Sequence, residues 1–121
     1  MEKPINATMH GVIDYAFAGI QLLGPTLLNL NPEFRKTYTI LGTGFTAVNA
    51  STDTEVGITK KLSMKTHQKA DTAFLATLSA LTVSGIVNKE KKARAFHLGF
   101  LGLALLNYLL TDYDSTKLPS S

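Results

Sequence analysis

The stretch His10-Gly-Val-Ile-Asp14-Tyr-Ala-Phe17 recurs 57 residues later as His67-Gln-Lys-Ala-Asp71-Thr-Ala-Phe74. Both copies have the pattern H-x-x-x-D-x-A-F. Because residues four apart lie on the same face of a helix, each copy predicts a helix that carries an imidazole and a carboxylate side by side. Two such pairs converge on one polar site if the two helices lie together.

The similarity between the two halves of the chain extends beyond this motif. At offsets of 58 and 59 residues, the matching positions are Gly44 with Gly102, Asn49 with Asn107, and Thr52-Asp-Thr-Glu55 with Thr111-Asp-Tyr-Asp114. Internal similarity at a fixed period indicates a repeated structural unit. We therefore expect a single domain, residues 1–121, that contains repeat 1 at about residues 5–55 and repeat 2 at about 63–114.

Each repeat predicts a hairpin of two helices. Asn31-Pro32-Glu33 combines the cap, the proline and the acid that favour a helix start, and Ser63 can cap the third helix. The expected helices run from about residue 5 or 8 to 28, 31 to 51, 64 to 87 and 93 to 110. No segment alternates apolar and polar residues, so we expect an all-α fold, an antiparallel four-helix bundle built from two hairpins.

Composition and hydropathy favour a membrane location for this bundle. Apolar residues make up 45% of the chain and gather at residues 15–28, 38–50, 73–87 and 93–110, which with flanking residues approach the ~20 of a membrane span. Gly42, Thr46 and Ala50 form a stripe of small residues, which allows close helix packing in lipid and permits a homo-oligomer. Lysine and arginine divide equally between the two ends of the bundle, so the orientation stays open.

Several functional classes are disfavoured by the composition. The chain has no cysteine, and its net charge of +3 is scattered, which argues against thiolate chemistry and nucleic-acid binding. It has no serine nucleophile elbow and no glycine-rich phosphate loop. A binding or structural role is therefore expected ahead of an enzyme.

The paired His and Asp residues predict a metal site. His10, Asp14, His67 and Asp71 would supply two imidazoles and two carboxylates from two helices, a set that suits zinc, or manganese or iron if water completes the shell. Weaker candidate ligands at the same end of the bundle are Asp53, Glu55 and Asp112.

Three other interpretations of these residues remain open. Each aspartate can accept a hydrogen bond from its own histidine, in a purely structural polar network. His10 and His67 can be the axial ligands of a haem, or the acids and histidines can form a proton or ion path. His97 lies about 20 residues along the bundle from His67, roughly 30 Å, so we interpret it as a packing histidine.

The duplicated hairpin, the H-x-x-x-D at the head of each half, and the link Ser51-Thr-Asp-Thr-Glu-Val-Gly57 resemble the SPW repeat proteins. These are small bacterial integral membrane proteins in which each repeat is two transmembrane helices. The resemblance implies a multi-pass location in the bacterial inner membrane, with lipid as a partner, and it implies no particular reaction. The alternative is a soluble helical bundle that binds metal or haem, either as a binding protein or as an enzyme.

Overall fold

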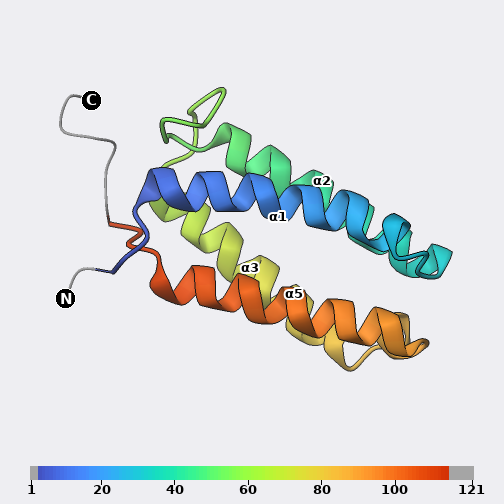
Figure 1. Ribbon diagram of the computed structural model, residues 1–121. Helices are drawn as coiled ribbons and strands as arrows, with labels where there is room; N and C mark the ends of the chain where they lie inside the picture. Colours follow the sequence, from blue (N-terminus) through green and yellow to red (C-terminus); the bar gives the residue numbers. More distant parts are fainter. Residues whose placement is uncertain (1–2, 115–121) are drawn as a thin grey trace.

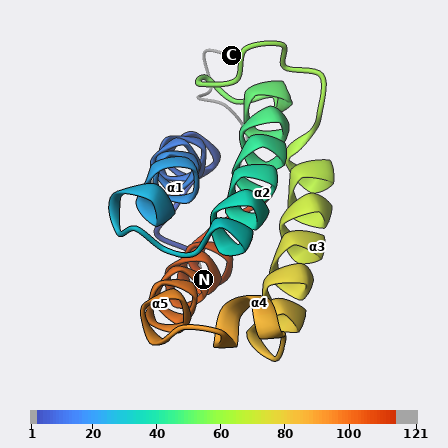
Figure 2. The ribbon, with the colours of Figure 1, turned by 90° about the vertical axis from the view of Figure 1, so that its right-hand side faces the viewer.

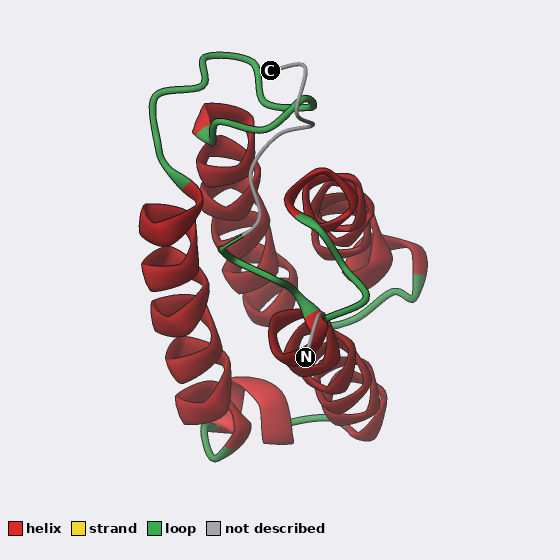
Figure 3. Cartoon of the chain, turned by 90° about the vertical axis from the view of Figure 1, so that its left-hand side faces the viewer, coloured by secondary structure: helices red, strands yellow, loops and turns green. Residues whose placement is uncertain are grey.

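Four long helices and one short helix make up most of the chain in a computed structural model that describes residues 3–114. They are α1 (Ala7–Leu27), α2 (Pro32–Ser51), α3 (Met64–Thr82), α4 (Gly85–Asn88) and α5 (Lys91–Leu110). Figure 3 shows helices joined by loops and, within the described part of the chain, no strand. The predicted all-α class is confirmed.

The helix starts follow the expected capping pattern. The side chains of Asn6, Asn31 and Ser63 each accept a hydrogen bond from a backbone N–H in the first turn of α1, α2 and α3, at 2.8, 2.9 and 3.1 Å. Such caps satisfy donors that the helix itself leaves free. Because α1 begins at Ala7 and α3 at Met64, His10 and His67 are both the fourth residue of their helix.

The third predicted helix is wrong at its end. A single helix was expected over residues 64–87, but α3 ends at Thr82 and the short α4 follows. The Val83 and Ser84 N–H groups bond to carbonyls three residues earlier, which tightens the last turn, and the Ser84 hydroxyl then caps α4. A β-branched pair followed by Ser-Gly favours this break, because serine competes for backbone hydrogen bonds and glycine weakens a helix.

Figures 1 and 2 show how the four long helices lie side by side. α1 packs along α2, and α5 packs against α1, α3 and α4. The core between them consists of Phe17, Leu30, Phe34, Tyr38, Leu78, Val87, Ala93, Phe100 and Ala104. Phe17 and Phe100 meet edge to face with centroids 5.4 Å apart, whereas Phe34 and Tyr38 are stacked with centroids 4.6 Å apart.

His97 belongs to this core and not to the end that carries the repeated motif. Its Nδ1 lies 2.8 Å from the Tyr38 hydroxyl, and its Nε2 lies 3.0 Å from the Leu78 carbonyl. The imidazole thus ties α2, α3 and α5 together. This agrees with the expectation of a packing histidine.

Two short backbone pairings hold the chain together at the end of the molecule that carries the repeated motif. Ile5 bonds to Leu110 and Asp112 at 3.1 and 2.7 Å, which holds the start of α1 against the end of α5. In the same way, Leu62 bonds to Ser51 and Asp53 at 2.8 and 2.6 Å, which holds the start of α3 against the end of α2. The residues that follow α2 and α5 are therefore brought to the starts of α3 and α1.

Among the described helices, α5 alone is long and apolar enough to cross a membrane, judged by length and composition. Four such helices were expected. The multi-pass topology therefore stays a prediction.

The packing predicts a large difference between two leucines of similar chemistry. Leu78 is completely buried, whereas Leu103 on α5 is 50% exposed. We expect Leu78→Ala to lower the free energy of unfolding by ~2–5 kcal/mol, because it leaves a cavity in the core. Leu103→Ala should change it by about 0.5 kcal/mol. Denaturant unfolding of both variants checks this, and equal effects would contradict the described packing.

Candidate metal centre

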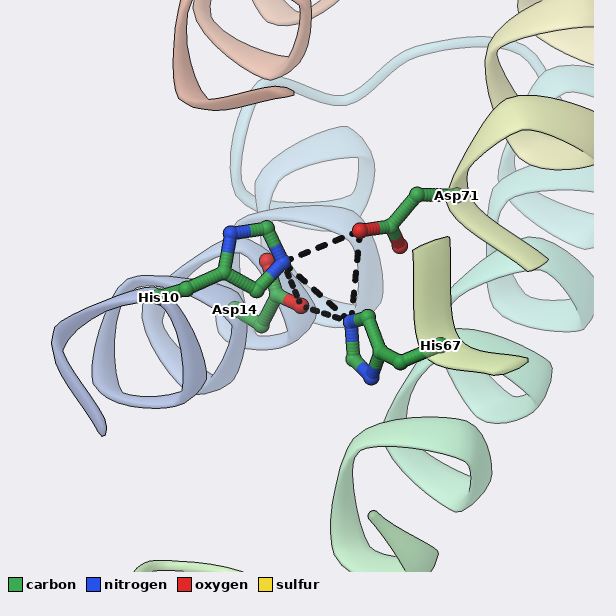
Figure 4. Close-up of side chains that lie close together, drawn as sticks. All are labelled: His10, Asp14, His67 and Asp71. Atoms are coloured by element: carbon green, nitrogen blue, oxygen red, sulfur yellow. Dashed lines mark hydrogen bonds and ion pairs between the residues drawn. The ribbon is translucent and has the colours of Figure 1, made fainter. Parts of the chain in front are cut away.

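The structure brings the four motif residues together in what we call the His–Asp centre: His10 and Asp14 from α1, and His67 and Asp71 from α3 (Figure 4). The two Nε2 atoms are 3.2 Å apart. Asp14 Oδ2 lies 3.0 Å from the Nε2 of His10 and 2.9 Å from that of His67. Asp71 Oδ2 lies 2.9 and 3.3 Å from the same two atoms. Each aspartate thus contacts both imidazoles and not only its own.

Two threonines fix the tautomer of both imidazoles. The Thr52 hydroxyl donates to the Val48 carbonyl at 2.7 Å, and the Thr111 hydroxyl donates to the carbonyl of Asn107. A hydroxyl has one proton, so each of these oxygens can only accept from the histidine beside it. His67 Nδ1 and His10 Nδ1, both 2.7 Å away, therefore carry their protons. In the neutral ring the lone pair is then on Nε2, which points into the His–Asp centre.

The carboxylates also have partners outside the group of four. Asn107 Nδ2 donates to Asp14 Oδ1 at 3.1 Å, and the Tyr113 hydroxyl donates to Asp71 Oδ2 at 2.6 Å. Partners of this kind orient ligand side chains around metal ions in proteins. They come from the end of α5 and the residues that follow it.

Burial governs the electrostatics of the centre, because none of its four residues is more than 6% exposed. Burial lowers the pKa of His67, but hydrogen bonds to Asp14 and Asp71 and the charges of these two groups outweigh it and raise the pKa to about 9. The same balance raises the pKa of His10. For Asp71, burial raises the pKa, but the two histidines outweigh it and lower the pKa to about 2. Without metal, protons on the imidazoles neutralise the buried carboxylates.

Tyr113 responds to the same carboxylate. Burial raises the pKa of its hydroxyl, and the charge of Asp71 raises it further. The tyrosine therefore stays a neutral hydrogen-bond donor to Asp71.

The three weaker candidate ligands do not join the centre. Asp53 and Glu55 are exposed, and Asp112 Oδ1 accepts a hydrogen bond from the Asp114 N–H. The chain is extended at Thr52 and at Thr111, and successive side chains of an extended segment point in opposite directions. The two threonines face inward, so Asp53 and Asp112, which follow them, face away from the centre, and Glu55 lies in an exposed turn.

Sequence reasoning missed Thr52, Thr111 and Tyr113 as partners of the centre. The signal that could have found them is the match between residues 52–55 and 111–114, in which the two threonines occupy equivalent positions. The Asn107 side chain is a hydrogen-bonding amide that donates to Asp14. Asn49 is another, since its Nδ2 donates to the Gly11 carbonyl at 2.8 Å.

The geometry leaves no slot for a haem between the two histidines. A porphyrin plane would have to pass between the Nε2 atoms, which contact each other and both carboxylates. The void beside the centre has a volume of about 10 Å³, the space of one water molecule. The arrangement suits a small ion.

Comparisons with known proteins add no further information on this site. No family model, no curated protein and no solved structure matches the chain. The resemblance to the SPW repeat proteins stays a prediction.

The pKa shifts predict how the stability of the metal-free protein depends on pH. The folded-state pKa of His67 lies above the ordinary value of 6.5, so its contribution is fully present below pH 6.5 and is lost as the pH rises through about 9. The pKa of Asp71 is lowered, so its contribution is present above pH 4 or so and is lost as the pH falls through about 2.

We therefore expect the free energy of unfolding, measured in chelator, to fall by on the order of a few kcal/mol between pH 6.5 and 9. His67→Gln should flatten this part of the profile. If the unaltered protein shows a flat profile over the same range, the imidazoles and carboxylates are not coupled as described.

Proposed function

We propose that the protein binds one divalent transition-metal ion, preferably zinc, at the His–Asp centre. One observation carries the proposal. The contacts between imidazole nitrogens and carboxylate oxygens are 2.9–3.3 Å. Ligands at zinc bond lengths of about 2.0–2.2 Å in a tetrahedron are about 3.3–3.6 Å from one another. All four donor atoms lie within 4.8 Å of one another, so small movements that part the two imidazoles and draw the two carboxylates together suffice to accommodate the ion.

The charge and protonation of the donors support the same conclusion. Two carboxylates balance a divalent cation, and neutral imidazoles donate through the Nε2 atoms that Thr52 and Thr111 leave unprotonated. Four protein ligands form the closed set typical of a structural or binding site, whereas catalytic zinc retains an open position. A binding role is therefore favoured over hydrolysis. Manganese or iron would need additional water ligands.

Zinc content tests the proposal directly. We expect about one zinc per chain in the purified protein, by elemental analysis, and loss of this zinc in His67→Gln because a ligand is removed. The matched control is His97→Gln, which alters a buried histidine outside the centre and should keep its zinc. If zinc is absent, or is unaffected by His67→Gln, the four residues are only a hydrogen-bonded network.

The threonines give a finer test of the same site. Thr52→Val keeps the shape of the side chain but removes the oxygen that accepts from His67 Nδ1. We expect zinc affinity, measured by competition with a chelating dye, to fall 10- to 100-fold, the usual effect of losing such a partner. Thr77→Val, at a threonine that also donates to a carbonyl four residues earlier but lies away from the centre, should leave the affinity unchanged. Equal affinities in all three proteins would contradict the proposed role of Thr52.

We also infer that the hairpin was duplicated. The caps Asn6 and Ser63 and both motif residues are 57 residues apart, and the threonines that hold the imidazoles are 59 apart. The backbone pairings of Ile5 with Thr111 and of Leu62 with Thr52 are related by the same offsets. Two copies of one hairpin, each completing the centre of the other in an antiparallel bundle, account for this recurrence.

We propose further that the protein is a multi-pass membrane protein. Residues 15–32, 37–52, 72–88 and 95–111 contain no acid, lysine or arginine. Their helical parts, within α1, α2, α3 and α5, are about 17–24 Å long, compared with the ~30 Å of a bilayer core. The His–Asp centre lies just outside these stretches, at one end. Lipid would be the partner of the surface between the ends.

The outward side chains of these stretches support the membrane proposal. Leu27, Ile40 and Val83 are 80, 65 and 86% exposed, and the outer face of α5 is largely leucine. Polar groups in lipid need internal partners. The exposed threonines that meet this need by donating to a carbonyl of their own helix are Thr39, Thr43, Thr72 and Thr77.

Cell fractionation tests the membrane proposal. We expect the protein to sediment with membranes, to resist extraction by alkaline carbonate and to require detergent for purification, because the apolar surface is then covered by lipid. Purification from the cytosol without detergent would contradict the proposal and leave the soluble metal-binding bundle.

A further inference from the structure

The charges at the turn end of the bundle, opposite the His–Asp centre, lie in two short segments. Residues 33–36 separate the uncharged stretches of α1 and α2, and residues 89–94 separate those of α3 and α5. Figure 1 shows both turns at the same end of the molecule. The two segments contain six of the twelve Lys and Arg residues but only two of the nine acids. Their net charge is therefore +4, whereas the rest of the chain has a net charge of −1.

We call the six cations of these segments the basic turn surface. Its members are Arg35, Lys36, Lys89, Lys91, Lys92 and Arg94. All except the half-buried Arg35 are exposed. Two hydrogen bonds hold the turns together, since Glu90 Oε1 accepts from the Asn31 N–H at 2.9 Å and Lys92 Nζ donates to the Leu28 carbonyl at 3.0 Å. The cations of both turns thus form one surface.

The positive charge of this surface is not neutralised by neighbouring acids. In the part of the chain that the structure describes, no acid forms an ion pair with any of the six cations. At the opposite end, by contrast, Lys65 pairs with Asp114. The two ends therefore carry equal numbers of cations but differ in the net charge that they present to a partner.

Helix stability does not account for these cations. Lys91, Lys92 and Arg94 lie in the first turn of α5, which contains no acid and has no capping side chain. The positive end of the helix dipole lies there and disfavours cations. A chain that breaks a local preference in this way usually does so at a functional surface.

Exposed apolar side chains lie directly beside the basic turn surface. Leu27 and Leu28, which are 80 and 48% exposed, precede the first turn, and Val83, which is 86% exposed, precedes the second. A surface that is apolar along its length and cationic at its edge matches the acyl chains and the phosphate of an acidic phospholipid. Nucleic acid would match only the cationic edge.

We propose that the basic turn surface binds the head groups of acidic phospholipids such as phosphatidylglycerol. The inference rests on the membrane location proposed above, which puts residues 33–36 and 89–94 at the level of the head groups. Lysine and arginine beside a bilayer attract anionic lipids, and each contributes about fivefold to the affinity. The opposite end, where acids offset the cations, shows no such preference.

The absence of tryptophan from the chain allows the lipid preference to be measured at each end. Leu27→Trp places a single fluorophore at the turn end and Leu109→Trp places one at the opposite end, at leucines that are 80 and 54% exposed. In reconstituted bilayers, phosphatidylglycerol and phosphatidylcholine with brominated acyl chains quench tryptophan on contact. We expect Leu27→Trp to prefer phosphatidylglycerol about fivefold and Leu109→Trp to show no preference.

Removal of the charge tests the origin of this preference. In the Leu27→Trp protein, four lysines of the two turns are replaced by glutamine, which lowers their net charge from +4 to zero and should abolish the preference. These lysines are Lys36, Lys89, Lys91 and Lys92. The matched control replaces four lysines of the opposite end and should keep the preference. Those are Lys3, Lys60, Lys61 and Lys69. Circular dichroism checks that both variants stay helical.

The outcomes separate this inference from the membrane proposal. Quenching of Leu27→Trp by neither lipid would overturn both. Equal quenching by the two lipids, or a preference that survives the four substitutions in the turns, would overturn this inference alone. Loss of the preference on addition of inorganic phosphate at constant ionic strength would overturn it as well, because the surface would then bind free phosphate in place of lipid.

Discussion

Burial of two carboxylates and two imidazoles in one place is the constraint on which the rest of the structure depends. Removing such charges from water is strongly unfavourable unless they are paired and fully hydrogen-bonded. The chain meets this requirement because each aspartate contacts both histidines. Further hydrogen bonds around these four residues come from Thr52, Thr111, Asn107 and Tyr113. A divalent cation satisfies the same four groups without protons on the imidazoles.

This constraint also accounts for the backbone pairings that join the ends of the helices. The threonines reach the histidines only because backbone pairings hold Leu62 and Ile5 against the residues that follow α2 and α5. The residues after α5 thus lie against the start of α1 and bring Thr111 to His10. In the same way, the residues after α2 lie against the start of α3 and bring Thr52 to His67. Neither hairpin has a complete site by itself.

The four central residues were predictable because their relation within each half is local. A spacing of four residues on a helix places His10 with Asp14 and His67 with Asp71, and the recurrence of the motif predicts that the pairs meet. The partners that come from distant positions in the sequence were not predictable in this way. Thr111 lies 101 residues from His10, and its role depends on the backbone pairing at Ile5.

The same local reasoning failed where the chain leaves the helical pattern. Asp53, Glu55 and Asp112 were expected near the site because they are close in sequence, but the extended backbone at Thr52 and Thr111 turns Asp53 and Asp112 away from it, and Glu55 lies in an exposed turn. The break after Thr82 depends on two i−3 hydrogen bonds and a serine cap, which a hydrophobic pattern does not reveal. The unequal roles of Asn49 and Asn107 likewise follow from packing.

X-ray absorption at the zinc edge is the most direct measurement of the central claim. The account predicts a first shell of four light atoms at about 2.0–2.2 Å, two of them imidazole nitrogens with their characteristic outer-shell scattering. A zinc ion surrounded by six oxygens without imidazole scattering, or a single histidine at the metal, would contradict the assignment of His10, Asp14, His67 and Asp71 as the four ligands.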